Sequence, residues 1–566
     1  MRKIRVILPL VILLTGLMTP VAALGATVSR VVVVVVPPIS WSDVTSGDMP
    51  ATRKLADTSS VGLLADHEAD SATALGKRFA TELPGSRGEI RIVSGGITEI
   101  DASVSAAASS VGEQGTLIIV SAASAPTGRS ERLGVAIIRG PLYPSGLLSS
   151  ASTHRKGLVT ADDVIGSMMG ALGLDFEVAA EWFDDGHSPA ERVSRLTEMD
   201  VSVSAAERLR IGMFNIYTIV MAALLLAGWL VAERFRTVRR FAYWSLVLRR
   251  ALLFGLSMPA GATILFAVDR YPESAVRIIG LMLAATGFVW IFAEFAWHRW
   301  RTAGAIGLIG TVTAVVLATD QLFGAPLSLA GVFSYSPVAA FRFFGIGNEG
   351  AALLVGAAIV GIALELDSLE VSATARRLVI AGAGVVAVGV CVLPAFGANV
   401  IVSLWGTAAF AAFYLAAEGR RPRVFELIAV VAVALGAVVL AVLLDRLGGG
   451  THIGRAINDV SGSGVNGLIA ERISTSIRIF TASPLPAIVL AIAGAFAYMR
   501  ARARGEMARV LAEYPVFAAA VTGGLVGGFV GAFAEDSGIV VLALVLMYAA
   551  ASLVALMLEP EGELGV

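Results

Sequence analysis

The feature that most constrains this chain is a long series of apolar runs after residue 210. Each run is close to the roughly 17–25 residues with which a helix crosses the hydrocarbon layer of a bilayer. The eleven runs span residues 211–232, 251–268, 276–297, 303–323, 349–366, 378–395, 400–417, 424–443, 484–499, 515–534 and 538–557. This pattern, with a mean hydropathy of +0.78, predicts an all-α polytopic membrane bundle of about eleven helices.

Charge and residue counts exclude several classes of function. Lys and Arg number 43 against 44 Asp and Glu, and the net charge of −1 gives no basis for nucleic-acid binding. The single cysteine, Cys391, lies inside an apolar run and has no partner for an intrachain disulfide. With five scattered histidines and no Cys-x-x-Cys motif, we expect neither a metal site nor a cofactor.

Residues 1–26 have the pattern of an export signal. A basic start, Arg2 to Arg5, precedes an apolar segment at residues 6–18, and small residues follow at 20–26. We expect this segment to be a secretory signal peptide or an uncleaved membrane anchor. In either case the residues that follow are expected outside the cytoplasm.

The next 160 or so residues contain no membrane-spanning run and predict a separate domain. The segments Val31–Val36, Thr116–Val120 and Gly134–Ile138 are short, continuous and mostly apolar, as buried strands are. Helical patterns lie between them, so we expect an extracytoplasmic α/β domain with a mainly parallel sheet. The predicted layout is this domain at 27–187, a connecting helix at 188–210, a transmembrane domain at 211–557 and a cytoplasmic tail at 558–566.

Four segments of the α/β domain occur in the same order as in a known protein superfamily. They are strand Val31–Val36, the segment Met49–Ala56, strand Leu117–Ser121 and the segment Gly157–Gly173. In order and spacing they resemble the alkaline phosphatase/sulfatase superfamily, which implies an alkaline-phosphatase-like fold. The chain as a whole is similar to bacterial polytopic membrane proteins that bear such an ectodomain in degenerate form.

The residues that bind metal in that superfamily are missing from this chain. The first strand of the family ends in a metal-binding Asp, where this chain has Pro37. A later strand of the family leads into Ser-Asp-His-Gly, where this chain has Ser121-Ala122-Ala123-Ser124. The resemblance therefore implies a catalytically inactive domain, retained for binding or assembly. Asp43, His67 and His154 are the remaining candidate ligands, and we interpret them as ordinary surface or loop residues.

Arginines gather in every second loop between the apolar runs. Those loops span residues 233–250, 298–302, 367–377, 418–423 and 500–514. Because basic residues favour the cytoplasmic side of a membrane, we expect these loops inside. The predicted location is the cytoplasmic (plasma) membrane, with many spans, the N-terminal domain outside and the C-terminus inside.

The unusual polar residues fall in the loops on the opposite side. Those loops span residues 324–348, 396–399, 444–483 and 535–537. Ionisable groups at the mouth of a membrane helix are costly and usually functional. We therefore predict one outward-facing site, with Glu349, His452 and Asp536 as catalytic candidates. The predicted substrate-binding residues are Arg342, Asn348, Asn399, Arg455 and Glu535.

The chemistry of this set suggests a phosphate-bearing ligand. Arg and His side chains hold phosphate oxygens, and a carboxylate such as Glu349 can act as a general base or an ion ligand. We expect a cell-envelope protein that binds or transfers a lipid-linked, phosphate-bearing glycan precursor at the outer leaflet, alone or with an envelope protein partner. Two alternatives stay open: an ion-coupled transporter or flippase, and a non-enzymatic envelope scaffold. A simpler interpretation of the same residues is that Glu–Arg pairs between loops hold the bundle together.

Overall fold

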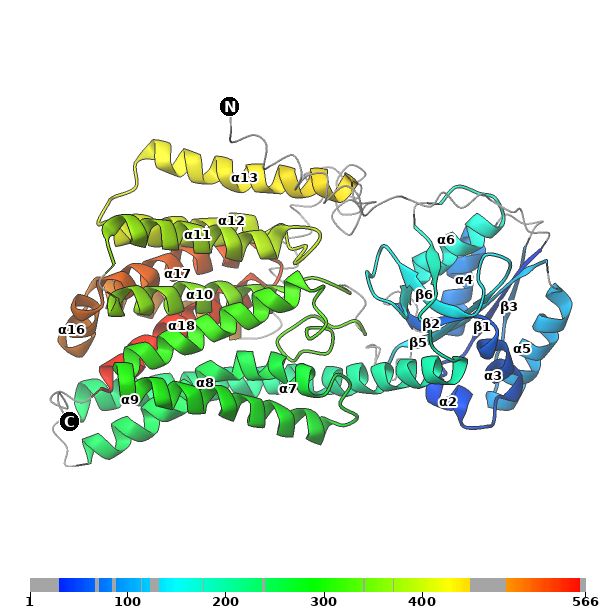
Figure 1. Ribbon diagram of the computed structural model, residues 1–566, viewed down its shortest axis with the longest axis horizontal. Helices are drawn as coiled ribbons and strands as arrows, with labels where there is room; N and C mark the ends of the chain where they lie inside the picture. The colour runs from blue at the N-terminus through cyan, green and yellow to red at the C-terminus, as the bar shows by residue number, and fades with distance from the viewer. Residues whose placement is uncertain are drawn as a thin grey trace.

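The computed structural model combines an N-terminal α/β region with a helical region, and a single long helix runs from one into the other (Figure 1). The two regions agree with the coarse part of the predicted fold class, an α/β domain followed by a helical region. The structure describes residues 30–66, 71–83, 88–112, 114–122, 132–176, 178–236, 240–338, 342–369, 371–447 and 485–559.

The α/β region is built on one mixed sheet. Its strands are β1 (Val31–Val36), β2 (Ser60–Ala65), β3 (Gly88–Ile92), β4 (Thr116–Ser121), β5 (Gly134–Arg139), β6 (Gly146–Ser150), β7 (Leu158–Thr160) and β8 (Ala180–Phe183). The order is β3-β1-β4-β5-β2-β6-β8, with β7 also paired to β2. The sheet is mixed: four of its seven pairings are parallel, as the prediction of a mainly parallel sheet requires, but β5 is antiparallel to both β4 and β2, and β8 is antiparallel to β6.

Helices cover both faces of this sheet, which explains the six consecutive valines of β1. The helices are α2 (Trp41–Thr45), α3 (Pro50–Asp57), α4 (Ala72–Glu82), α5 (Ile97–Val111) and α6 (Ala161–Ala171). Val31, Val33 and Val35 belong to the same buried cluster as side chains of α4 and α6. Val32, Val34 and Val36 point to the other face and cluster with α3, α5 and the start of the long helix. Side chains alternate across a strand, so a strand buried on both faces needs an unbroken apolar run.

The helical region contains long apolar helices. They are α7 (Pro189–Arg234), α8 (Phe241–Val268), α9 (Ala275–Leu322), α10 (Asn348–Ser368), α11 (Ala373–Val392), α12 (Val402–Ala417), α13 (Val424–Leu447), α15 (Leu485–Ala501), α16 (Gly505–Glu513), α17 (Pro515–Ala534) and α18 (Gly538–Met557). Among the described residues, eight helices are long and apolar enough to cross a membrane: α7 to α11, α13, α17 and α18. Each predicted apolar run overlaps a helix of this region, and two runs share α9. The runs at 400–417 and 484–499 overlap α12 and α15, which are not among these eight. The prediction of a polytopic membrane protein is confirmed at this level.

Helix α9 is bent sharply at Trp300 and Arg301. The φ angle of Arg301 is +61°, in the left-handed region that a non-glycine residue rarely adopts. An ion pair holds the bend, because Arg301 Nε lies 3.3 Å from Oε1 of Glu559, just beyond α18. The two predicted spans at 276–297 and 303–323 are thus the two arms of one bent helix (Figure 1).

Helix α7 continues without a break from the α/β region into the bundle. It begins with a capping box, in which Ser188 and Glu191 bind each other's backbone N–H groups. At 1.5 Å per residue its 46 residues extend about 69 Å. Val193 and Leu196 are buried against the sheet, whereas Ile216 lies 63% exposed on the apolar half. The predicted connecting helix and the first predicted span therefore form one rigid element.

The close contact between α9 and α10 depends on two glycines. A Cβ on Gly310 would lie 2.8 Å from the Cα of Gly361, and a Cβ on Gly361 would lie 2.7 Å from the backbone nitrogen of Thr311. Small residues allow helix backbones in a membrane to approach this closely. Helix α10 is consequently buried along most of its length, and its first residues, Asn348 and Glu349, occupy a fixed position.

Candidate functional site

The chain enters α10 through a turn that only glycine accommodates. Gly345 has a φ of +77°, and a Cβ there would lie 2.2 Å from the carbonyl oxygen of Gly397. The next residue, Ile346, donates its backbone N–H to the same oxygen at 2.8 Å. The loop before α10 is thus fastened to the loop between α11 and α12, and glycine is needed because its missing side chain admits the contact.

Three of the predicted site residues form one hydrogen-bonded network. Asn348 Nδ2 donates to Asp536 Oδ1 at 2.8 Å and to Ser537 Oγ at 2.8 Å. Asn399 Nδ2 donates in turn to Asn348 Oδ1 at 2.9 Å. Both amide hydrogens and the carbonyl oxygen of Asn348 are therefore in use. The network joins the start of α10 to the α11–α12 and α17–α18 connections, so residues up to 189 positions apart meet at one end of the bundle.

Arg342 is held beside this network by backbone carbonyls. Its Nη1 donates to the oxygens of Ile346 at 2.8 Å and Gly397 at 3.4 Å. Burial lowers the pKa of Arg342, and the nearby carboxylates of Glu535 and Asp536 oppose that shift. The guanidinium is a fixed positive charge within electrostatic range of these acidic residues.

Glu349 is the acidic residue of the first turn of α10. A carboxylate is favoured there, because the N-terminus of a helix carries a partial positive charge. Among the residues that the structure describes, its carboxylate makes no salt bridge or hydrogen bond with another side chain. Arg342, Asp536 and Arg210 of α7 lie within electrostatic range, and Arg210 is itself paired with Glu207 at 3.1 Å. Glu349 is thus the site carboxylate that has no side-chain partner in the described part of the chain.

Glu535 has a structural partner that sequence reasoning missed. The carboxylate is buried and accepts a hydrogen bond from Trp405 Nε1 of α12 at 3.0 Å. Asp536, the next residue, is exposed and faces solvent. The two neighbouring acids therefore differ in role. Glu535 links α12 to the end of α17, and Asp536 is the solvent-exposed member of the polar network.

Some predicted site residues lie outside the described part of the chain. His452 and Arg455 are among them, as is His67 of the α/β domain. Their assignment stays a prediction.

Asp43 is occupied as a helix cap, with its Oδ2 accepting from Ser40 N at 2.7 Å. The ring of His154 packs 4.2 Å from the ring of Phe344. Across the described ranges, no group of three or more His, Cys, Asp or Glu side chains is arranged to hold a metal ion.

The α/β domain reaches the site loop through Arg155, which sequence analysis did not single out. Its Nη2 donates to Ala325 O and to Tyr335 Oη, each at 2.7 Å, and its Nε donates to Phe343 O at 3.0 Å. Phe343 adjoins Arg342 in the chain. Arg155 follows His154 in a polar, basic turn. That sequence was the available signal for a contact with the bundle, but it equally fits an exposed loop.

Comparison of the chain with known protein families, curated proteins and solved structures yields no match. The resemblance of the N-terminal domain to the alkaline phosphatase/sulfatase superfamily stays a prediction.

Proposed function

We propose that this integral membrane protein serves the cell envelope by binding or transferring a lipid-linked, phosphate-bearing glycan precursor at the outer leaflet. The observation that supports the proposal is that Arg342, held by two backbone carbonyls, lies within electrostatic range of Glu349 at the mouth of α10. A guanidinium and a carboxylate without a side-chain partner among the described residues, next to a lipid-facing bundle, suit a ligand with a phosphate and a long apolar tail.

Arg342 binds the phosphate in this proposal. Of its three nitrogens, only Nη1 has a hydrogen-bond partner among the described residues, and that partner is backbone. The other two nitrogens present the fork that recognises phosphate oxygens in a bidentate manner. The carbonyls of Ile346 and Gly397 keep the fork in one orientation, which lowers the entropy cost of binding.

Glu349 acts as the proton acceptor for the transfer step. A hydroxyl group of an incoming acceptor would give its proton to the carboxylate as the hydroxyl oxygen attacks the phosphate-linked carbon. The leaving phosphate stays on Arg342, whose charge stabilises it. Asn348, Asn399 and Asp536 position the two residues by holding the three loops together.

The α/β domain covers the same end of the bundle (Figure 1). Arg155 joins it to the loop that carries Arg342. We assign it a binding or capping role in this proposal, as expected of a phosphatase-like domain without the metal-binding residues of its family.

A second candidate, ion-coupled transport, is favoured by the charge of the site. Three carboxylates, those of Glu349, Glu535 and Asp536, lie within electrostatic range of one guanidinium, that of Arg342, and such excess negative charge at a membrane helix suits H⁺ or Na⁺. Uptake or lipid flipping in proteoliposomes that requires an ion gradient and stops in Glu349→Gln would establish this alternative.

The proposal is tested by binding of a polyprenyl phosphate to the full chain in lipid nanodiscs, with the neutral polyprenol as the ligand control. Arg342→Ala should weaken binding about tenfold or more, since a hydrogen bond to a charged group contributes roughly 1.5–3 kcal/mol. The matched control is Arg277→Ala, which removes an arginine paired with Asp269 near the start of α9. Equal binding of phosphate and alcohol would contradict the proposal.

The same variants separate transfer from a scaffold role in cells. Arg342→Ala, Glu349→Gln and His452→Ala should each abolish envelope function at unchanged protein abundance. Retention of function in all three, with loss on deletion of residues 28–200, would identify a scaffold instead.

A further inference from the structure

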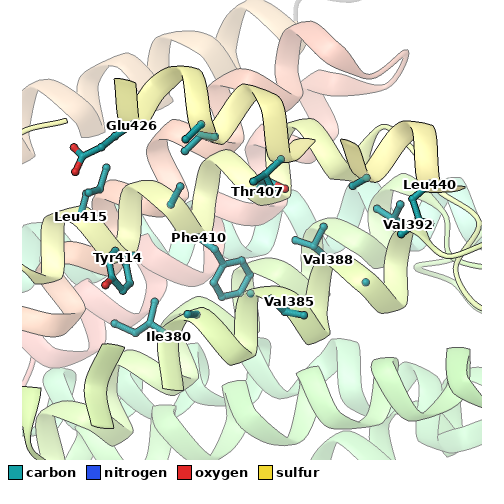
Figure 2. Close-up of a pocket in the computed structure, with 18 of the residues that line it drawn as sticks. Ile380, Val385, Val388, Val392, Thr407, Phe410, Tyr414, Leu415, Glu426 and Leu440 are labelled. Carbon is teal, nitrogen blue, oxygen red and sulfur yellow. The ribbon is translucent and has the colours of Figure 1, made fainter. Parts of the chain in front are cut away.

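Helices α11, α12 and α13 enclose an open groove whose lining includes none of the residues of the polar network. Its volume is about 670 Å³, within the roughly 300–1,000 Å³ of small-molecule sites. Figure 2 shows Val385 and Val388 of α11, Phe410 of α12 and Leu440 of α13 along its walls. Nearly all the lining is apolar, so the groove suits a hydrocarbon chain and not a polar substrate.

The groove exists because α13 packs loosely on its neighbours. Leu427, Val431 and Leu435 of α13 are all more than half exposed. In a membrane these side chains contact lipid. An apolar space between helices is filled by hydrocarbon, because the side chains around an empty space would lose dispersion contacts. A chain lying in the groove would contact three helices at once.

The groove ends in polar and basic residues on the side where α12 stops and α13 starts. Tyr414 and Glu426 lie at that end in Figure 2, and Arg420 lines it as well. Arg420 is paired with Glu426. The next two arginines, Arg421 and Arg423, make no side-chain hydrogen bond or ion pair among the described residues. Both are exposed and follow Arg420 in the loop at this end of the groove, where guanidinium groups complement an anionic headgroup.

We propose that this groove binds an anionic phospholipid, with one acyl chain between α11, α12 and α13 and the phosphate headgroup at Arg421 and Arg423. The negative charge of the headgroup complements the arginines, and the apolar wall complements the acyl chain. The site is independent of the proposed function, because it shares no residue with the site around Arg342 and Glu349 and binds its ligand by different chemistry.

Two glycines of α11 supply a matched test. Gly389 lines the groove, and a Cβ added there would meet no atom within 4 Å. Gly382 on the same helix has equally open surroundings but does not line the groove. Leucine at either position suits a helix better than glycine, so both variants should fold. Gly389→Leu fills the groove, and Gly382→Leu does not.

The experiment is native mass spectrometry of the full chain purified with phosphatidylglycerol or with phosphatidylcholine. The wild type and Gly382→Leu should retain one phosphatidylglycerol in preference to phosphatidylcholine, and Gly389→Leu should lose it. The double variant Arg421→Gln and Arg423→Gln should lose the headgroup preference, whereas Arg502→Gln in another arginine-rich loop should keep it. Equal retention of both lipids by the wild type, no retained lipid, or full retention by Gly389→Leu would overturn the proposal.

Discussion

Arg155 Nη2 donates a hydrogen bond to Tyr335 Oη at 2.7 Å, across 180 positions of sequence. The hydroxyl of Tyr335 in turn donates a hydrogen bond to Phe343 O at 3.1 Å. The loop that carries Arg342 is therefore supported from the α/β domain on one side and from Gly397 on the other. Placement of the site depends on both regions of the protein.

Removal of the Arg155 side chain should loosen this loop. Arg155→Ala leaves three buried oxygen acceptors with one donor fewer each, and an unsatisfied buried polar group costs about 1–3 kcal/mol. Hydrogen exchange of the backbone around Tyr335 and Phe343 should speed up. Arg195→Ala, which removes an exposed arginine of α7, is the control and should leave exchange unchanged. Unchanged protection in Arg155→Ala would show that the contact does not order the loop.

A side chain at Gly345 should disrupt the entry to α10. Gly345→Ala forces alanine into a left-handed backbone, at roughly 1–2 kcal/mol, and places its Cβ against Gly397 O. We expect a lower thermal midpoint and weaker ligand binding. Gly382→Ala has no such contact and should raise stability slightly or leave it unchanged. A stable Gly345→Ala variant with normal binding would refute the described turn.

The polar network can be tested by cross-linking. Asn348→Cys and Asp536→Cys should react rapidly with a short bifunctional thiol reagent, because the native side chains are 2.8 Å apart. Cys391→Ser removes the one native cysteine from the background. A pair of Asn348→Cys with Arg502→Cys is the control and should not cross-link within one molecule. Equal yields from the two pairs would mean that the loops do not meet.

The junction of the α/β domain with α7 should weaken in acid. Burial raises the pKa of Asp185. The hydrogen bonds and charge of Arg192, 2.9 Å away, lower the pKa by more than that, so its net value lies below the ordinary one. A depressed folded-state pKa contributes stability that is present above the unfolded value of about 3.9 and is lost as pH falls through the folded pKa. The thermal midpoint should therefore drop on acidification below about pH 4. Asp185→Asn should reduce that drop, and an identical pH profile for the variant would contradict the assignment.

Local sequence patterns predicted much of this fold and less of its site. The valine run of β1 indicated burial on both faces, and Gly345-Ile346-Gly347-Asn348-Glu349 indicated a special helix entry. The break at Arg301 falls inside the predicted loop at 298–302, but the ion pair of Arg301 with Glu559, far along the chain, was not predictable. The contact of Arg155 was missed for the same reason. Long-range partners leave no periodic trace in a sequence.

The most direct test of the proposed site is to find where its ligand binds. A polyprenyl phosphate with a photoreactive group near the phosphate is activated on the full chain in nanodiscs, and the labelled peptides are sequenced. The account predicts labelling of the segment from Arg342 to Glu349, suppressed in Arg342→Ala. Labelling elsewhere in the bundle that is unaffected by Arg342→Ala would contradict it.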